Sequence, residues 1–163
     1  MTNLTATYTD QYQLAMAQVY FENGQKNTTA VFDYFFRKLP FNGGYAIFAG
    51  LESVLETLKE FRFSKSDISY LQKQGYSDEF LEYLKNFKFT GTIYSVAEGD
   101  VVFPTRPVLQ VEANIIEAQL IETLLLNLLN FQTLVATKAS RIRLVSGDHQ
   151  LLEFGLRRAQ ATG

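Results

Sequence analysis

The sequence predicts a mixed α/β fold, with one domain followed by the start of another. Segments with apolar residues at helical spacing alternate along the chain with short β-branched and aromatic segments. The chain has 163 residues, 47% of them apolar, which is enough to bury a core without a disulfide or a structural metal.

The first half of the chain predicts two helices and a strand. In residues 10–22, Tyr12, Met16 and Val19 recur at the spacing of an amphipathic helix, and Gly24 follows its end. Residues 28–36 are β-branched and aromatic, which predicts a strand. After a loop at residues 40–44, the apolar spacing of residues 46–58 predicts a second helix.

The second half predicts two short helices, two strands and one long helix. Ser64 and Asp67 have the spacing of a capping box, and Ser77 is placed to begin the next helix, through residue 87. Residues 91–96 and 108–113 are strand-like, with a turn at residues 98–100 between them. Residues 115–145 are apolar on almost every side, so we expect a long helix inside an assembly.

The last segment, residues 151–154, predicts a short buried strand. Its apolar residues would need neighbours on both edges and cover on both faces, and few residues follow it. We therefore expect the chain to be the front part of a longer polypeptide, or a piece of an assembly. The expected division is one domain over residues 1–135 and the start of a second over residues 136–163.

Composition and charge exclude several classes of protein. Without cysteine there is no disulfide framework, thiolate metal site or cysteine nucleophile, and we expect a cytoplasmic location. A net charge of −2 argues against broad nucleic-acid binding. The N-terminus lacks the pattern of a signal peptide, and polar residues interrupt the most apolar stretch, so we expect no membrane partner.

Few single residues indicate catalysis. The one histidine, His149, follows a Gly-Asp break and is therefore expected to lie in a loop. No Ser or Cys nucleophile accompanies it, which argues against a catalytic role. Glu117 and Glu122 are five residues apart, which does not place them side by side on a helix, so we expect solvating or capping roles.

Two cationic segments carry stronger signals, each with a plain alternative. Residues 137–143 form a basic, hydroxyl-rich stretch that is either a charged exposed helix end or a phosphate-facing surface containing Arg141. In residues 153–158, Phe154 and the pair Arg157 and Arg158 are either a core ring followed by surface charges or a clamp. In such a clamp the ring stacks on a flat ligand while an arginine pairs with its carboxylate.

Four blocks, in order along the chain, resemble nicotinate phosphoribosyltransferase. They are TDQYQ at residues 9–13, FFRKLPF with GGYA and AGL within residues 35–51, FQTLVATK at residues 131–138 and EFGLRRAQ at residues 153–160. The likeness runs through the whole chain, which corresponds to about the first third of a full-length member of that family.

The resemblance implies a fold and a reaction. The family has an N-terminal α/β sandwich domain followed by an irregular α/β barrel, of which residues 151–154 would be the first strand. Its members form nicotinate mononucleotide and pyrophosphate from nicotinate and phosphoribosyl pyrophosphate, coupled to ATP hydrolysis, in NAD salvage. ATP and Mg²⁺ are thus implied, as is a homodimer whose active sites are completed by both subunits.

The resemblance also implies roles for individual residues. Tyr12 matches the tyrosine that stacks on the pyridine ring in the partner's site, and Asp10 would support it. Phe154 matches the residue on the other face of the ring, and Arg157 the one near the nicotinate carboxylate. Arg37 and, more weakly, Arg141 match phosphate-binding positions.

Other functions stay open at this point. The family's phosphorylated histidine would lie beyond residue 163 and does not match His149, so we place no catalytic residue and no metal ligand in this chain. The chain alone is therefore expected to be inactive. Two alternatives stay open: the chain is a non-catalytic dimerisation or binding module, or it is part of a nicotinamide or quinolinate phosphoribosyltransferase.

Overall fold

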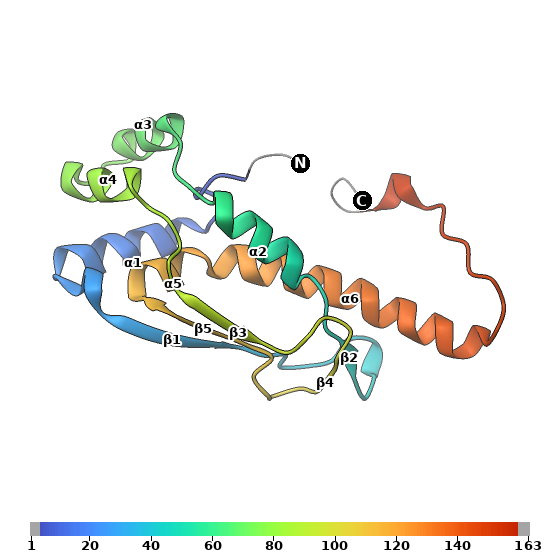
Figure 1. Cartoon of the computed structure of the whole chain (residues 1–163). Helices are drawn as coiled ribbons and strands as arrows, with labels where there is room; N and C mark the ends of the chain where they lie inside the picture. Colours follow the sequence, from blue (N-terminus) through green and yellow to red (C-terminus); the bar gives the residue numbers. More distant parts are fainter. Residues whose placement is uncertain (1–3, 160–163) are drawn as a thin grey trace.

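The computed structural model describes residues 4–159, which form a layer of helices over one face of a small antiparallel sheet (Figure 1). The prediction of a mixed helix and strand fold is confirmed in this form. The helices are α1 (Gln11–Glu22), α2 (Leu51–Glu60), α3 (Lys65–Lys73), α4 (Asp78–Lys85), α5 (Ile115–Leu120) and α6 (Glu122–Ser146). The strands are β1 (Thr29–Tyr34), β2 (Ala46–Ile47), β3 (Thr92–Ser95), β4 (Val101–Val102) and β5 (Leu109–Asn114).

The strands form two antiparallel units. The larger has the order β1-β5-β3, with Phe32 and Ile93 both opposite Val111. The smaller pairs β2 with β4, with Ala46 opposite Val102. In β5 the alternate residues Leu109, Val111 and Ala113 are buried on the face that α5 covers. The domain is therefore α+β, with antiparallel strands and helices gathered on one side.

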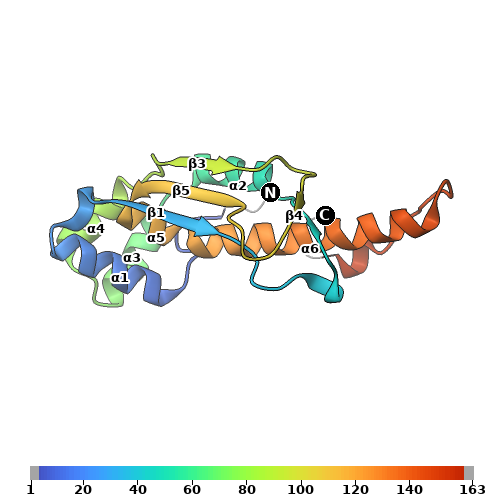
Figure 2. The same ribbon diagram turned by 90° about the horizontal axis from the view of Figure 1, so that it is seen from below.

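The predicted long helix is divided near its start. Asn114 caps α5 by accepting hydrogen bonds from the backbone N–H groups of Ile116 (2.9 Å) and Glu117 (3.1 Å). The chain then turns at Ile121 and continues as α6. The first part of α6 buries Leu124, Leu125 and Leu129 in the core. Its last part is exposed and extends past the sheet (Figure 2).

Helix α1 is present where it was predicted, but its apolar stripe faces outward. Tyr12, Met16 and Val19 are 54%, 39% and 53% exposed, whereas Gln13, Leu14 and Ala17 are buried. An amphipathic helix normally turns its apolar face to the core. Here α1 instead packs against α5, and its buried face includes the small residue Ala17.

Several predicted helix boundaries are confirmed and one is wrong. The capping box at Ser64 and Asp67 is present, with both reciprocal hydrogen bonds, and starts α3. Ser77 precedes α4 as expected. The helix predicted from residue 46 begins only at Leu51, because Ala46 pairs in β2 and Gly50, at φ +105°, turns the chain between the two.

The predicted strand at residues 151–154 is wrong. This segment is irregular, and Leu152 and Phe154 are 75% and 91% exposed. No strand within residues 4–159 pairs with it, so its backbone has no ladder partner and its side chains have no cover. Only 136–159 of the expected second domain lie within the described residues, and they contain the end of α6 and this segment.

Candidate functional site

A row of hydroxyl groups on α6 binds the segment of residues 45–49. Thr133 Oγ1 accepts from the Ala49 N–H (3.2 Å) and donates to the Ala49 carbonyl (3.1 Å). One turn later Thr137 Oγ1 accepts from the Ile47 N–H (2.9 Å), and Ser140 Oγ lies 3.2 Å from the Tyr45 hydroxyl. Hydroxyl spacing of three and four residues places all three on one helix face. The polar residues that interrupt an apolar helix thus hold β2 against it.

Arg141 continues this row to the loop that precedes β2. Its guanidinium carbon lies 5.4 Å from the centre of the Phe41 ring and 5.7 Å from that of Tyr45. Its Nη1 donates to the Phe41 carbonyl at 3.4 Å. A side chain at Gly43 would overlap the Nη2 atom, so this glycine makes room for the guanidinium. Arg141 therefore fills the inner side of the loop, and is half-buried, unlike the exposed Lys138 and Arg143.

The predicted phosphate contact Arg37 is the first residue of this loop, residues 37–44, and is exposed. The residue before it, Phe36, accepts a hydrogen bond from the Thr105 N–H through its carbonyl (2.8 Å). Within residues 4–159 the one ion pair joins Lys85 and Glu82, so no carboxylate there neutralises Arg37 or Arg141. Arg37 thus lies four residues before Phe41, the loop residue that Arg141 contacts.

Tyr12 stands beside an open cavity between α1 and the start of α6. The cavity has a volume of about 470 Å³. Besides Tyr12 it is lined by Asp10, Glu122, Thr123, Leu126, Asn127, Asn130, Phe131 and Leu134. Two polar links tie the helices here: Thr123 Oγ1 donates to Asp10 (3.2 Å), and the fully buried Gln13 donates to Glu122. The Tyr12 ring is therefore held on a braced helix start while its face stays open.

The phenol of Tyr12 is part of the same hydrogen-bond group. Gln13 Nε2 donates to Tyr12 Oη at 2.9 Å. The negative charge of Glu122 raises the pKa of Tyr12, and burial and the Asp10 charge raise it further. The phenol therefore stays protonated at neutral pH, and its O–H remains available as a donor.

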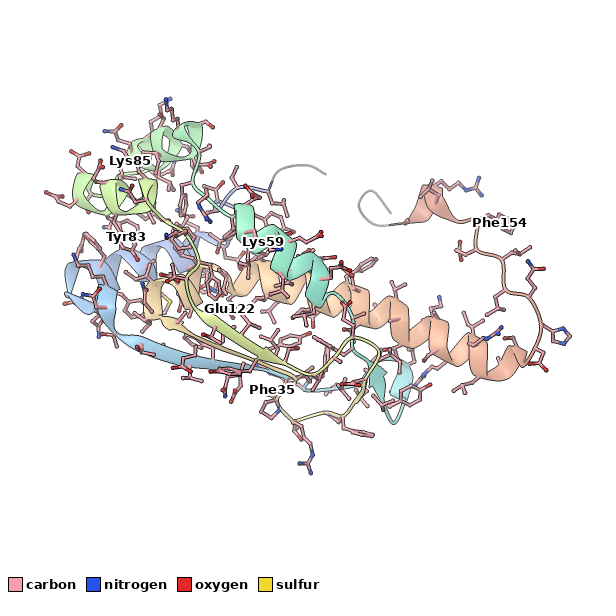
Figure 3. All side chains as sticks on the ribbon, viewed as in Figure 1. Phe35, Lys59, Tyr83, Lys85, Glu122 and Phe154 are labelled. Atoms are coloured by element: carbon pink, nitrogen blue, oxygen red, sulfur yellow. The ribbon has the colours of Figure 1, made fainter. Side chains whose placement is uncertain are left out.

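The structure does not bring the two sides of the predicted ring clamp together within one chain. Phe154 lies on the segment that follows α6, whereas Glu122 marks the start of that helix, at the other end of its length (Figure 3). Arg157 is exposed in a short 3-10 turn of the same segment. His149 lies in the irregular segment before it, exposed, as predicted.

Sequence reasoning missed the residues that brace the site. Gln13 was not singled out, although a polar residue beside an apolar stripe is the available signal. Glu117, expected to be solvating or capping, is buried and accepts from the Thr90 N–H (2.6 Å) and from Asn114 Nδ2 (3.1 Å). It therefore joins the start of α5 to the segment that leads into β3.

Residues 4–159 contain no group of three or more acidic, histidine or cysteine side chains that would hold a metal ion. None of the helices described is both long and apolar enough to cross a membrane.

Comparison with known proteins gives one family. Residues 7–130 match the profile of the nicotinate phosphoribosyltransferase (NAPRTase) N-terminal domain. Nicotinate phosphoribosyltransferase of Bacillus subtilis is 54% identical over 153 residues, covering 93% of this chain and 31% of that protein. The Caenorhabditis elegans enzyme of the same name is 50% identical, with 93% of this chain and 28% of its own covered.

Solved structures agree with the sequence comparison. The crystal structure of human nicotinic acid phosphoribosyltransferase superposes with a TM-score of 0.86 at 39% identity, covering 94% of this chain and 32% of that one. The nicotinate-nucleotide pyrophosphorylase of Pyrococcus furiosus, at 23% identity and a TM-score of 0.72, shares the fold. The chain spans about a third of the length of these relatives.

Proposed function

The chain belongs to the nicotinate phosphoribosyltransferase family, and we propose that it supplies the N-terminal part of an enzyme that forms nicotinate mononucleotide from nicotinate and phosphoribosyl pyrophosphate, coupled to ATP hydrolysis in NAD salvage. The observation that carries this proposal is the family match over residues 7–130. Because the chain spans about a third of its relatives, we propose that turnover also requires a barrel domain like theirs. Residues 1–135 are then the proposed N-terminal domain and residues 136–163 the proposed start of the barrel domain.

The chemistry suits a protein that positions its reactants. Displacement of pyrophosphate from the anomeric carbon passes through an oxocarbenium-like state, so a flat nucleophile must be held in line while phosphate charge is neutralised. Tyr12 is the proposed stacking ring, since its face is open beside a cavity and its phenol is braced. Asp10 supports it through the link to Thr123.

Phe154 and Arg157 are the proposed opposite wall of the nicotinate site. Phe154 would stack on the second face of the pyridine ring, and Arg157 would pair with the carboxylate through charge-assisted hydrogen bonds. Both are exposed and lie far along the chain from Tyr12. We therefore propose that the site forms in a homodimer, with Tyr12 of one subunit facing Phe154 of the other.

Arg37 is the proposed phosphate contact. It is exposed and has no carboxylate partner within the described residues, so its donors are available to phosphate oxygens. Arg141 belongs to the same proposed surface, but its guanidinium is directed at Phe41, Tyr45 and Gly43. The family also implies ATP and Mg²⁺. We assign no residue of this chain to either of them.

A chimeric enzyme tests the proposal. The 153 residues that match the Bacillus subtilis enzyme would replace their counterparts in it, and nicotinate mononucleotide formation would be measured with nicotinate, nicotinamide and quinolinate as substrates. We expect activity with nicotinate, loss of most of it in Tyr12→Ala, and none in the 163-residue chain alone. A folded chimera that is inactive, or one that prefers another substrate, would refute the assignment.

A second candidate, a dimerisation module without catalysis, is favoured by one observation. Tyr12, Met16 and Val19 leave an apolar stripe of α1 exposed, and such a surface commonly marks an interface. Light scattering on the 163-residue chain tests it. A dimer lost in Met16→Glu, together with an inactive chimera, would favour this function over the first.

A further inference from the structure

We propose that Arg141 is a positioning residue rather than a phosphate ligand: it fixes one end of the loop of residues 37–44 and thereby places Arg37 for phosphate. Only one part of this inference, the role of Arg37 in binding phosphate, rests on the proposed function. The loop contacts that support it are independent of any activity.

One end of the loop is fixed by Arg141. The guanidinium lies over the Phe41 and Tyr45 rings and reaches the Phe41 carbonyl. It occupies the space that any side chain at Gly43 would take. Arg141 is half-buried there, and a cation–π contact gains strength as the cation loses water.

The loop needs such a contact because its backbone is strained. Phe41 and Asn42 both have positive φ angles, 61° and 51°, although neither is glycine. This conformation is uncommon for non-glycine residues and persists where surrounding contacts impose it. Of the two, only Phe41 lies under the Arg141 guanidinium, and Asn tolerates a positive φ better than Phe, so Arg141 is the side chain placed to hold Phe41 in this conformation.

The other end is fixed by the β4–β5 connection. The Thr105 N–H donates to the Phe36 carbonyl at 2.8 Å, and the Val108 N–H donates to the Tyr34 carbonyl at 2.8 Å. Residues 37–40 are thus a four-residue bridge between two anchors, and Arg37 begins it. A short bridge held at both ends has few conformations left to lose when its side chain binds an anion, so Arg37 is partly organised in advance.

Two neighbouring glycines provide a matched pair of variants. Gly43→Ala places a methyl group on the Arg141 Nη2 position, whereas a Cβ at Gly44 meets no atom within 4 Å. Gly43→Ala should therefore eject the guanidinium from the loop while leaving its charge in the protein, and Gly44→Ala should not. Arg141→Lys provides a third variant, with the charge kept and the flat stacking surface lost.

Limited trypsin digestion of the 163-residue chain tests the anchoring directly, because Arg37 and Lys38 are themselves cleavage sites within the bridge. Cleavage of a folded protein reports local opening. We expect Gly43→Ala and Arg141→Lys to accelerate cleavage at these two residues by at least about fivefold, with cleavage after Lys59 unchanged and Gly44→Ala like the parent. Equal protection in all four proteins would overturn the proposal.

Kinetics of the chimeric enzyme test the consequence for phosphate. We expect Gly43→Ala and Arg141→Lys to raise KM for phosphoribosyl pyrophosphate by about five- to tenfold, with KM for nicotinate nearly unchanged. Neither change should add to that of Arg37→Ala in a double variant. An unchanged KM for phosphoribosyl pyrophosphate in Arg141→Lys would mean that Arg141 acts through its charge alone, as a phosphate ligand would. An equal rise in both KM values would mean a general structural role. Either result overturns positioning.

The design separates this inference from the proposed function. An inactive parent chimera rejects the function but leaves the trypsin result to decide the anchoring. If Arg37→Ala does not change KM for phosphoribosyl pyrophosphate in an active chimera, the assigned role of Arg37 is wrong, and the positioning inference with it.

Discussion

Replacing Thr137 by valine should destabilise the domain through a single unpaired amide. Thr137 is fully buried on α6, and its Oγ1 accepts the Ile47 N–H at 2.9 Å. Ile47 pairs with Val101 of β4, but its N–H points to α6 and has its partner there. Valine has nearly the same shape as threonine and offers no acceptor, so the variant leaves the Ile47 N–H without a partner.

The expected cost follows from that loss. Leaving a buried donor unsatisfied costs about 1–3 kcal/mol. For a chain of this size each kcal/mol lowers Tm by about 2–4 °C, so we expect a decrease of about 2–12 °C. The helix-internal bond from Thr137 Oγ1 to the Thr133 carbonyl (2.6 Å) is also lost, but that carbonyl keeps its backbone partner in α6.

Thr57→Val is the matched control. The Thr57 hydroxyl donates only to the Ser53 carbonyl within α2 (2.7 Å), so its loss should change stability by no more than about 0.5 kcal/mol. Both variants would be unfolded in urea and followed by circular dichroism, with the slope m checked for constancy. Equal effects of the two substitutions would refute the reasoning, because the β2 to α6 hydrogen bond would then contribute nothing.

Further predictions concern four other positions. Ser64→Ala, which removes the capping box of α3, should cost about 1 kcal/mol in urea unfolding. Leu129→Ala, at a fully buried site, should cost about 2–5 kcal/mol in the same assay. Glu122→Gln should lower the pKa of Tyr12, measured as the phenolate absorbance that disappears in a Tyr12→Phe background. Burial raises the pKa of Tyr34 above its ordinary value of 10.0, so the stability from its neutral phenol is complete below that pH and is lost as the pH rises further. Tyr34→Phe should therefore lose less stability than the parent between about pH 10 and pH 12, by urea midpoints.

Local signals in the sequence were sufficient for most elements of the fold. The capping box at Ser64 and Asp67 and the β-branched run of β1 depend on neighbouring residues, and both predictions hold. The start of α2 and the strand at residues 151–154 were wrong because strand pairing depends on distant partners. Ala46 has β4 beside it and joins a strand, whereas Phe154 has no partner strand in the described chain and lies exposed.

For the site residues, too, the sequence was less informative where a role depends on distant contacts. The family likeness proposed Tyr12 and Arg37 as site residues, and the structure shows both side chains exposed, which the helical spacing of Tyr12 did not predict. Gln13 and Gly43 stand in the same blocks but received no role, because their roles are set by contacts with α6 more than ninety residues away along the chain. Arg141 could be recognised as a cation in the sequence, but only its position over two rings indicates that it holds a loop.

The outward apolar stripe of α1 shows how a contact that the sequence pattern does not reveal can matter for function. Periodicity correctly places Tyr12, Met16 and Val19 on one face, but it cannot say whether that face is covered by the same chain. Gln13 lies on the buried side, where its Nε2 donates to the Tyr12 phenol and to Glu122, although its Oε1 has no partner among the described residues. Burying Gln13 turns the Tyr12 ring outward and fixes it there. The departure from the usual inward apolar face is therefore what a residue needs if it is to stack on a ligand held by another subunit.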